Sequence, residues 1–242
     1  MIKNTLKSNK YFNFIYRRIF FPNLSQPEKD IYYLRKLNFD YSLDIGANVG
    51  TYSIELSKIS KKVIAFEPIK KIYKYTKEYL PKNVILNNFA LGNCTKKQKI
   101  FTPLQKNSNA EYALSSIKNK PKYYVAETIT TKKFDIIFKR KKFLDKIDFI
   151  KIDTEGYEYE IILGMKQFLK KNNPIFLIEI EKKHNKRYKN FFLLMKNLGY
   201  KICIFDNEKK FLKNLDFKFF LNKKLNINFN KKFGNNFWFI RY

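Results

Sequence analysis

Strand-like and helix-like hydrophobic patterns alternate along the chain from Tyr41 onward. Short apolar runs are typical of buried strands, and longer stretches with apolar residues at helical spacing separate them. The predicted strands are 41–45, 62–67, 83–88, 147–153, 175–180, 200–205 and 235–242. The predicted helices are 51–59, 69–80, 156–170 and 186–198. Because strands and helices take turns, we expect an α/β fold with a mainly parallel sheet of seven strands and right-handed crossovers.

The middle of the chain departs from this alternation. Within residues 95–131 the pattern predicts a strand pair, formed by 98–102 and 123–130. The polar segment between them, 107–119, is long enough for a functional loop.

The two ends of the chain carry additions to the domain expected at 41–242. Residues 1–40 predict one or two helices, a helical extension that packs on the domain, acts as a lid or lies on an anionic membrane surface. Residues 207–234 are basic and aromatic, and we treat them as a variable insertion of uncertain structure.

The net charge of +29 is less informative about function than its size suggests. Only six of the 50 basic residues are arginine, and the chain is rich in Lys, Asn, Ile, Phe and Tyr, whose codons are rich in A and T. A surface that reads phosphates more often uses the planar fork of Arg. The charge is therefore better explained by genome composition than by a specific nucleic-acid partner.

Other features favour a cytoplasmic protein. Cys94 and Cys203 lie far apart and have no metal-like spacing, so we expect free thiols in a reducing compartment. The chain has no window of about 18 apolar residues for a membrane span. Asn13, Arg17 and Arg18 interrupt what would be the core of a signal peptide. A peripheral position at the inner face of the membrane is the alternative, and the sequence leaves the oligomeric state open.

A glycine-containing loop after the first predicted strand indicates a nucleoside ligand. Gly46 and Gly50 allow a tight turn and a close approach of the backbone to a ligand. Glu67 ends the second predicted strand, where an acidic side chain commonly accepts hydrogen bonds from ribose hydroxyls. The spacing differs from the glycine fingerprint of dinucleotide sites, and Asp44 would repel a pyrophosphate but suits a cationic amino-acid group. These features favour S-adenosylmethionine as the cofactor.

The same segments resemble FkbM-type methyltransferases, a family of class I enzymes that use S-adenosylmethionine. The matching stretches are "DIGANVGTYS" at 44–53, "VIAFEP" at 63–68, "NNFALGN" at 87–93, "SS" at 115–116, "IDFIKIDTEGYEYEIILGM" at 147–165 and "IFLIEI" at 175–180. The resemblance implies a Rossmann-like sheet with helices on both faces and an antiparallel last strand. It also implies O-methylation of a sugar, glycan or glycolipid as the first expectation for the reaction.

The resemblance also assigns cofactor-binding roles. Residues that match the loop around the methionine part are Asp44, Gly46, Asn48 and Gly50. Glu67 would bind the ribose, and Asn88 and Ala90 would border the adenine.

Acidic residues after the fourth and fifth predicted strands are candidates for the acceptor site. Asp153, Glu155 and Glu179 are expected at the same sheet edge as the loop, whereas Glu158 and Glu160 fit the first turn of a helix, where negative charge is favourable. A hydroxyl needs help to lose its proton, either from a base or from a divalent metal ion held by these acids. Asp153 or Glu155 is the first choice of base, and Glu179 would orient the acceptor.

Two further residues bear on the proton acceptor. His184 is the only histidine and is an alternative base, although its basic surroundings also fit an ordinary surface loop. Tyr157 stands where many members of the family carry His, so the usual acceptor of the proton is in question here.

Two other functions stay open. One is methylation of a ribose 2′-hydroxyl in RNA, which the charge and the aromatic termini favour; a base-methylating enzyme is disfavoured because 153–156 reads Asp-Thr-Glu-Gly. The other is a non-catalytic protein on the membrane surface that keeps the fold, which the intact loop and Glu67 disfavour.

Overall fold

A computed structural model describes residues 29–105, 110–139, 142–181, 184–206, 208–218 and 234–242. Its main sheet has eight strands in the order β10-β9-β11-β8-β7-β1-β2-β3. Their bounds are β1 (Phe39–Ile45), β2 (Ser60–Phe66), β3 (Val84–Asn87), β7 (Ile147–Ile152), β8 (Ile175–Glu179), β9 (Lys201–Asp206), β10 (Phe211–Leu215) and β11 (Asn236–Ile240).

Strand directions confirm the mainly parallel sheet with an antiparallel last strand. Strands β3, β2, β1, β7 and β8 pair in parallel, and β11 lies antiparallel between β8 and β9. The chain moves outward from β1 to β3 on one side and continues from β7 to β8 on the other. The strand order therefore reverses between β1 and β7, and in open α/β sheets ligands bind at the carboxyl ends of the strands beside such a point.

The expected number of seven strands in this sheet is wrong by one. The additional strand is β10, which pairs antiparallel with β9 at the edge of the sheet. It lies in the basic segment 207–234, whose structure the hydrophobic pattern did not resolve. An edge strand with several exposed residues lacks the apolar run of the central strands, and this is why the pattern does not reveal it.

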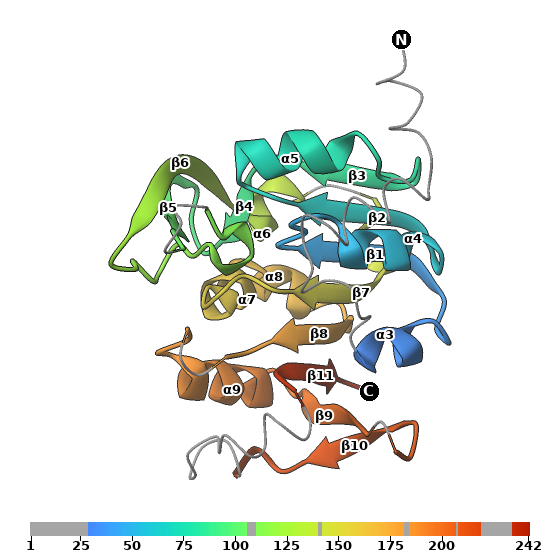
Figure 1. Cartoon of the computed structure of the whole chain (residues 1–242). Coiled ribbons are helices and arrows are strands. Elements are labelled where there is room, and N and C mark those ends of the chain that lie inside the picture. The colour runs from blue at the N-terminus through green and yellow to red at the C-terminus, as the bar shows by residue number, and fades with distance from the viewer. Residues whose placement is uncertain (1–28, 106–109, 140–141, 182–183, 207, 219–233) are drawn as a thin grey trace.

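Helices cover both faces of the main sheet (Figure 1). Buried residues of α3 (Lys29–Leu34) and α4 (Thr51–Ser57) form one core cluster with the sheet. The opposite cluster holds residues of α6 (Phe134–Ile137), α7 (Glu158–Gly164), α8 (Lys166–Leu169) and α9 (Tyr188–Asn197). The helix predicted over 156–170 is thus two short helices, separated at Met165.

Helix α3 is anchored to the last strand of the sheet. The indole nitrogen of Trp238 in β11 donates a hydrogen bond of 2.5 Å to the buried carboxylate of Asp30. Tyr33 packs edge-on against the same indole ring, with 5.2 Å between the ring centroids. The part of the predicted N-terminal extension before residue 29 lies outside the described residues.

A second sheet lies beside the carboxyl ends of the parallel strands, next to α5 (Lys70–Lys77) (Figure 1). Its order is β4-β6-β5, with bounds β4 (Ala90–Gly92), β5 (Lys96–Pro103) and β6 (Tyr124–Lys133). The antiparallel pair of β5 and β6 confirms the predicted strand pair. The described part of the loop between them contains the short helix η2 (Tyr112–Leu114), and Ser116 bridges back to Phe101 of β5.

The thiols and the helices bear on two general expectations. Cys94 and Cys203 are both free thiols, as expected. Across the described ranges, no helix combines the length and the apolar character that a membrane span requires.

Candidate active site

The loop after β1 passes directly over the end of β7. Gly46 has a φ of +88°, and a Cβ atom there would lie 1.8 Å from the carbonyl oxygen of Asp153. Asn48 and Gly50 also have positive φ angles, of 47° and 71°. The two glycines, together with a non-glycine residue in the left-handed region, let the loop curl at the sheet edge and leave its backbone open to a ligand.

Glu67 closes this loop from the end of β2. One carboxylate oxygen accepts a hydrogen bond of 2.9 Å from the backbone N–H of Asn48, and the other accepts one of 2.8 Å from Ile69. The side chain is buried, and burial raises its pKa to about 7. Each carboxylate oxygen has a further lone pair, so Glu67 retains capacity to accept hydrogen bonds from a ribose.

A pocket of about 650 Å³ opens beside Glu67. One wall comes from the strand ends and carries Gly46, Asn48, Glu67 and Ala90. The rest of the lining comes from the loop around η2 and from the segment after β7. Its residues are Tyr112, Ala113, Ser115, Ile117, Asp153, Thr154, Glu155 and Tyr157. Its mixture of apolar walls with a few polar groups suits a small-molecule ligand.

Three predicted cofactor residues lie outside the lining of this pocket. Asp44 is buried, accepts a hydrogen bond of 2.5 Å from the hydroxyl of Ser53 in α4, and has its pKa raised to about 6 by burial. Gly50 begins α4 and faces side chains of α5 and the turn after it. The amide of Asn88 donates to the carbonyl oxygens of Glu67 and Pro68, both at 2.9 Å. These residues shape the loop and the strand ends on which the lining residues sit.

An acidic pocket adjoins the first one. Asp153, Glu155, Glu179, Glu181 and His184 line it, together with Gly156 and Glu158. The structure thus brings the predicted catalytic residues from β7, β8 and the loop after β8 to one place, apart from Tyr157. Asp153 and Glu155 line both pockets and therefore mark their junction.

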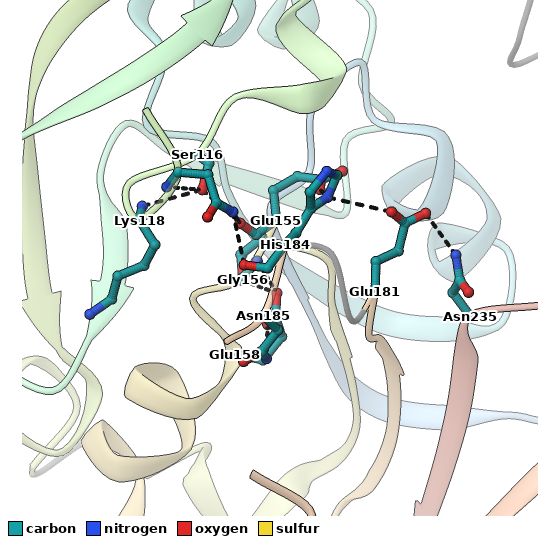
Figure 2. Close-up of polar contacts among 11 residues, drawn as sticks. Ser116, Lys118, Glu155, Gly156, Glu158, Glu181, His184, Asn185 and Asn235 are labelled. Carbon is teal, nitrogen blue, oxygen red and sulfur yellow. Dashed lines mark hydrogen bonds and ion pairs between the residues drawn. The ribbon is translucent and has the colours of Figure 1, made fainter. Parts of the chain in front are cut away.

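His184 lies between two carboxylates in the acidic pocket (Figure 2). Its Nδ1 contacts the carboxylate of Glu155, and it lies 3.5 Å from that of Glu181. The side-chain amide of Asn235 donates a hydrogen bond of 2.7 Å to Glu181. His184 is thus held among acidic side chains, and its own side chain is 21% exposed.

The neighbouring acid Glu158 braces the backbone. Its carboxylate accepts hydrogen bonds from the N–H of Gly156 at 2.9 Å, the hydroxyl of Thr154 at 3.1 Å and the amide of Asn185 at 2.8 Å. Burial raises its pKa. Glu158 therefore ties the segment after β7 to the loop that carries His184, which is a structural role.

Tyr157 lines the first pocket and packs against the small sheet. Its hydroxyl accepts a hydrogen bond of 3.0 Å from the amide of Gln98 in β5, and its ring lies against Gly92 of β4. Burial raises the pKa of the phenol. A neutral phenol held by Gln98 contributes to the wall of the pocket.

Sequence reasoning missed one residue beneath the site, Lys151 of β7. Its side chain is 0% exposed, and its ammonium lies 3.8 Å from the carboxylate of Asp153, 3.1 Å from the amide oxygen of Asn236 and 4.7 Å from the ring centroid of Tyr52. A lysine inside the apolar run "IDFIKID" was the available signal, because lysine is almost never fully buried unless it is paired.

Ser116 and Asn119 also had no predicted role in the site. Ser116 and Asn119 lie in a polar loop whose contacts with the strand ends only the fold reveals. The expected metal ligands Asp153, Glu155 and Glu179 do not form a metal-binding group: within the described ranges, no three His, Cys, Asp or Glu residues are placed to hold an ion together.

The strand order, the positive-φ loop and the pocket at the carboxyl ends define a class I methyltransferase fold of the Rossmann-like type. The family model described as "Methyltransferase FkbM domain" matches residues 44–202. The chain therefore belongs to the FkbM methyltransferase family.

Solved structures similar to this chain include two methyltransferases at 14% sequence identity. One is methyltransferase FkbM from Methylobacillus flagellatus KT, with a TM-score of 0.45, 82% of this chain covered and 53% of that one. This chain thus spans about half the length of that protein. The other is SMU.1697c, a putative methyltransferase from Streptococcus mutans in complex with SAH, with a TM-score of 0.47, 88% of this chain covered and 94% of that one. No curated protein matches the sequence.

Proposed function

We propose that the protein transfers the methyl group of S-adenosylmethionine to a hydroxyl of a sugar, glycan or glycolipid. The observation that carries this proposal is the junction of two pockets at Asp153 and Glu155. A methyl donor in the first pocket and a hydroxyl in the acidic pocket would meet beside carboxylates that can take a proton. Positioning and proton removal are what the protein must supply, because the cofactor supplies the electrophile.

The first pocket would hold the cofactor through residues of its lining. Glu67 would accept hydrogen bonds from the ribose, and Ala90 with its apolar neighbours would border the adenine. The backbone around Gly46 would approach the methionine part. Asp44 adds negative charge beneath the loop but remains bonded to Ser53.

The transfer is an in-line displacement in which a C–O bond forms as the C–S bond breaks. The cofactor would supply the methyl group and leave as a neutral thioether, the acceptor would become a methyl ether, and a carboxylate would take the hydroxyl proton. Asp153 is our first choice of base, because His184 contacts Glu155 directly, whereas the ammonium of Lys151 lies 3.8 Å from Asp153. The pair of Glu155 and His184, with Glu179, orients the acceptor in the acidic pocket.

A divalent cation is the second way to activate a hydroxyl. Treatment of the purified protein with a chelator separates the two routes. We expect activity to persist, because the carboxylates at the junction suffice to accept the proton. Loss of activity that added Mg²⁺ or Mn²⁺ restores would replace the base mechanism by a metal-assisted one.

Calorimetry and a labelled-methyl assay test the proposal together. We expect S-adenosylhomocysteine to bind the wild-type protein and to bind Glu67→Ala at least about tenfold more weakly, since charge-assisted hydrogen bonds to the ribose are lost. Asp153→Asn should retain binding and lose turnover by about 100-fold or more, as expected for a removed base. Asp148→Asn is the matched control, because Asp148 begins the same strand β7 at the opposite edge of the sheet. Full turnover in Asp153→Asn would remove this residue from the mechanism.

A further inference from the structure

A third pocket, of about 450 Å³, lies next to the acidic one and is basic. It shares Gly156 and His184 with the acidic pocket. Its other lining residues are Lys118, Asn119, Glu160, Asn185, Lys186 and Arg187. Three cationic side chains against one carboxylate give this pocket a positive excess, in contrast to its acidic neighbour.

Glu160 forms ion pairs with two of the cations on one side of the basic pocket. The ammonium of Lys118 lies 2.8 Å and the guanidinium of Arg187 lies 3.5 Å from the same oxygen of Glu160. The Glu160 side chain is 4% exposed, whereas those of Lys118 and Arg187 are 42% and 58% exposed. The carboxylate therefore lies behind the two cations, and their remaining donors are open to a ligand.

Hydrogen bonds fix the basic pocket relative to the candidate catalytic residues. The amide of Asn119 donates to the carbonyl oxygens of His184 at 2.8 Å and Glu155 at 3.3 Å. The hydroxyl of Ser116 donates to the same Glu155 oxygen at 2.6 Å. Figure 2 shows Lys118 leaving this loop in a direction away from His184. A ligand that bridges the two pockets would thus have its charged part and its reacting part held by one rigid unit.

We propose that the basic pocket binds a phosphate group carried by the saccharide acceptor, so that the substrate is a phosphorylated or phosphate-linked sugar. The proposal rests on the function proposed above, because it places the reacting hydroxyl at Asp153 and Glu155. A phosphate monoester carries about −1.5 to −2 charge at neutral pH, which matches a site with three cations and one anion. Arg187 supplies the planar fork that pairs with phosphate in two hydrogen bonds, and the lysines add point charges.

Pyrophosphate is a probe that needs no knowledge of the sugar. Calorimetry of the full-length protein, with S-adenosylhomocysteine bound, should detect pyrophosphate binding. We expect Arg187→Gln and Lys118→Gln each to weaken it by roughly five- to tenfold, since each removes one partly exposed charge-assisted contact. Glu160→Gln should strengthen it, because the competing carboxylate charge is gone.

The control variant is Lys36→Gln, which removes one exposed positive charge before β1, at the opposite edge of the sheet. If the basic pocket is the binding site, Lys36→Gln should bind pyrophosphate with an affinity within about twofold of wild type. Equal weakening in Lys36→Gln and Arg187→Gln would show that only the overall charge attracts the anion, and would overturn the proposal. Arg187→Gln is the primary variant because its side chain is more than half exposed; thermal unfolding of Lys118→Gln checks that its fold is retained.

A second arm distinguishes a soluble sugar phosphate from a lipid-linked one. Phosphatidylcholine vesicles with and without a polyprenyl phosphate are sedimented with wild-type and Arg187→Gln protein. Binding that requires both the polyprenyl phosphate and Arg187 supports a lipid-linked acceptor. Pyrophosphate binding in solution without vesicle binding supports a soluble one.

The same samples separate the failure of this proposal from the failure of the proposed function. Wild-type protein that binds S-adenosylhomocysteine but no pyrophosphate and no phosphate-bearing vesicle would overturn the phosphate site and leave methyl transfer intact. Protein that binds pyrophosphate through Arg187 but no S-adenosylhomocysteine would overturn the proposed function instead.

Discussion

At the residue scale, the unusual acid is Glu67. Burial raises its pKa from 4.5 to about 7, although two backbone N–H groups favour the charged form. Ribose hydroxyls donate best to a carboxylate, so cofactor binding should expel the proton that Glu67 holds at lower pH. We predict that calorimetric affinity for S-adenosylhomocysteine rises severalfold between about pH 6 and pH 8. Titration of the ligand itself affects all variants equally. The increase of affinity with pH should therefore be smaller in Glu67→Gln, which lacks the contribution of Glu67.

The same shift predicts how the cofactor-free protein responds to pH. Between pH 4.5 and about 7 the folded state holds a proton on Glu67 that the unfolded state has already released. Stability therefore falls as pH rises through this window and levels off above it. Thermal unfolding at several pH values should show a shallower fall in Glu67→Gln. A variant with the same pH profile as wild type would contradict the buried, protonated state of Glu67.

Individual residues differ in how far the sequence revealed them. Glu67 was identified from its place at the end of the second apolar run, and the structure puts it in the pocket wall. Asp44 was expected beside the ligand, but a carboxylate at a strand end can turn under the following helix, and here Ser53 holds it there. The cluster of Lys118, Glu160 and Arg187 joins three distant segments, and a pattern along the chain cannot reveal such a cluster.

At the element scale, α7 lies unusually close to β4. A Cβ atom on Gly164 of α7 would lie 2.0 Å from the carbonyl oxygen of Gly92, a backbone atom that cannot move alone. We predict that Gly164→Ala destabilises the protein by about 2 to 4 kcal/mol, because the helix must shift off the small sheet. Urea unfolding measures this loss.

Gly92→Ala is the matched comparison. A Cβ atom there would lie 2.9 Å from a ring carbon of Tyr157, which is a side chain with some freedom to adjust. The expected loss is smaller, about 1 kcal/mol. If both variants unfolded at the same urea concentration as wild type, that result would contradict the close approach of α7 to β4.

Strands in the centre of the sheet and the edge strand β3 were predictable from the sequence, whereas the edge strand β10 was not. Buried strands such as β7 and β8 carry continuous apolar runs, which the sequence shows directly. Strand β10 is held in the sheet by its pairing with β9, and its own residues are mostly exposed. The helix expected over 156–170 divides at Met165, whose backbone leaves the α-helical region with a φ of −104° and a ψ of 6°.

At the scale of the whole molecule, the net charge of +29 makes weak binding to polyanions unavoidable. We predict that the protein binds single-stranded RNA of any sequence at about 50 mM salt and loses that affinity by orders of magnitude at about 200 mM. Filter binding with two unrelated RNA sequences checks this. Tight binding to one of them that survives the higher salt would favour an RNA 2′-hydroxyl as acceptor over a saccharide.

The pocket beside Glu67 followed from the sequence more readily than the acidic and basic pockets. Loop glycines, Glu67 and the "KIDTEGYE" segment lie on or beside core strands, so short motifs identify them. The acidic and basic pockets are built where the loop at 110–119, the end of β8 and the segment before α9 meet. Their juxtaposition depends on the closed fold and on hydrogen bonds such as that from Asn119 to His184.

The most direct test of the central claim is mass spectrometry of saccharides and glycolipids from cells that produce wild-type protein, Asp153→Asn or no protein. We predict a methyl ether in wild-type cells that is missing both without the protein and with Asp153→Asn, and that is retained with Asp148→Asn. Identical saccharides and glycolipids in all these cells would contradict the assignment of the acceptor.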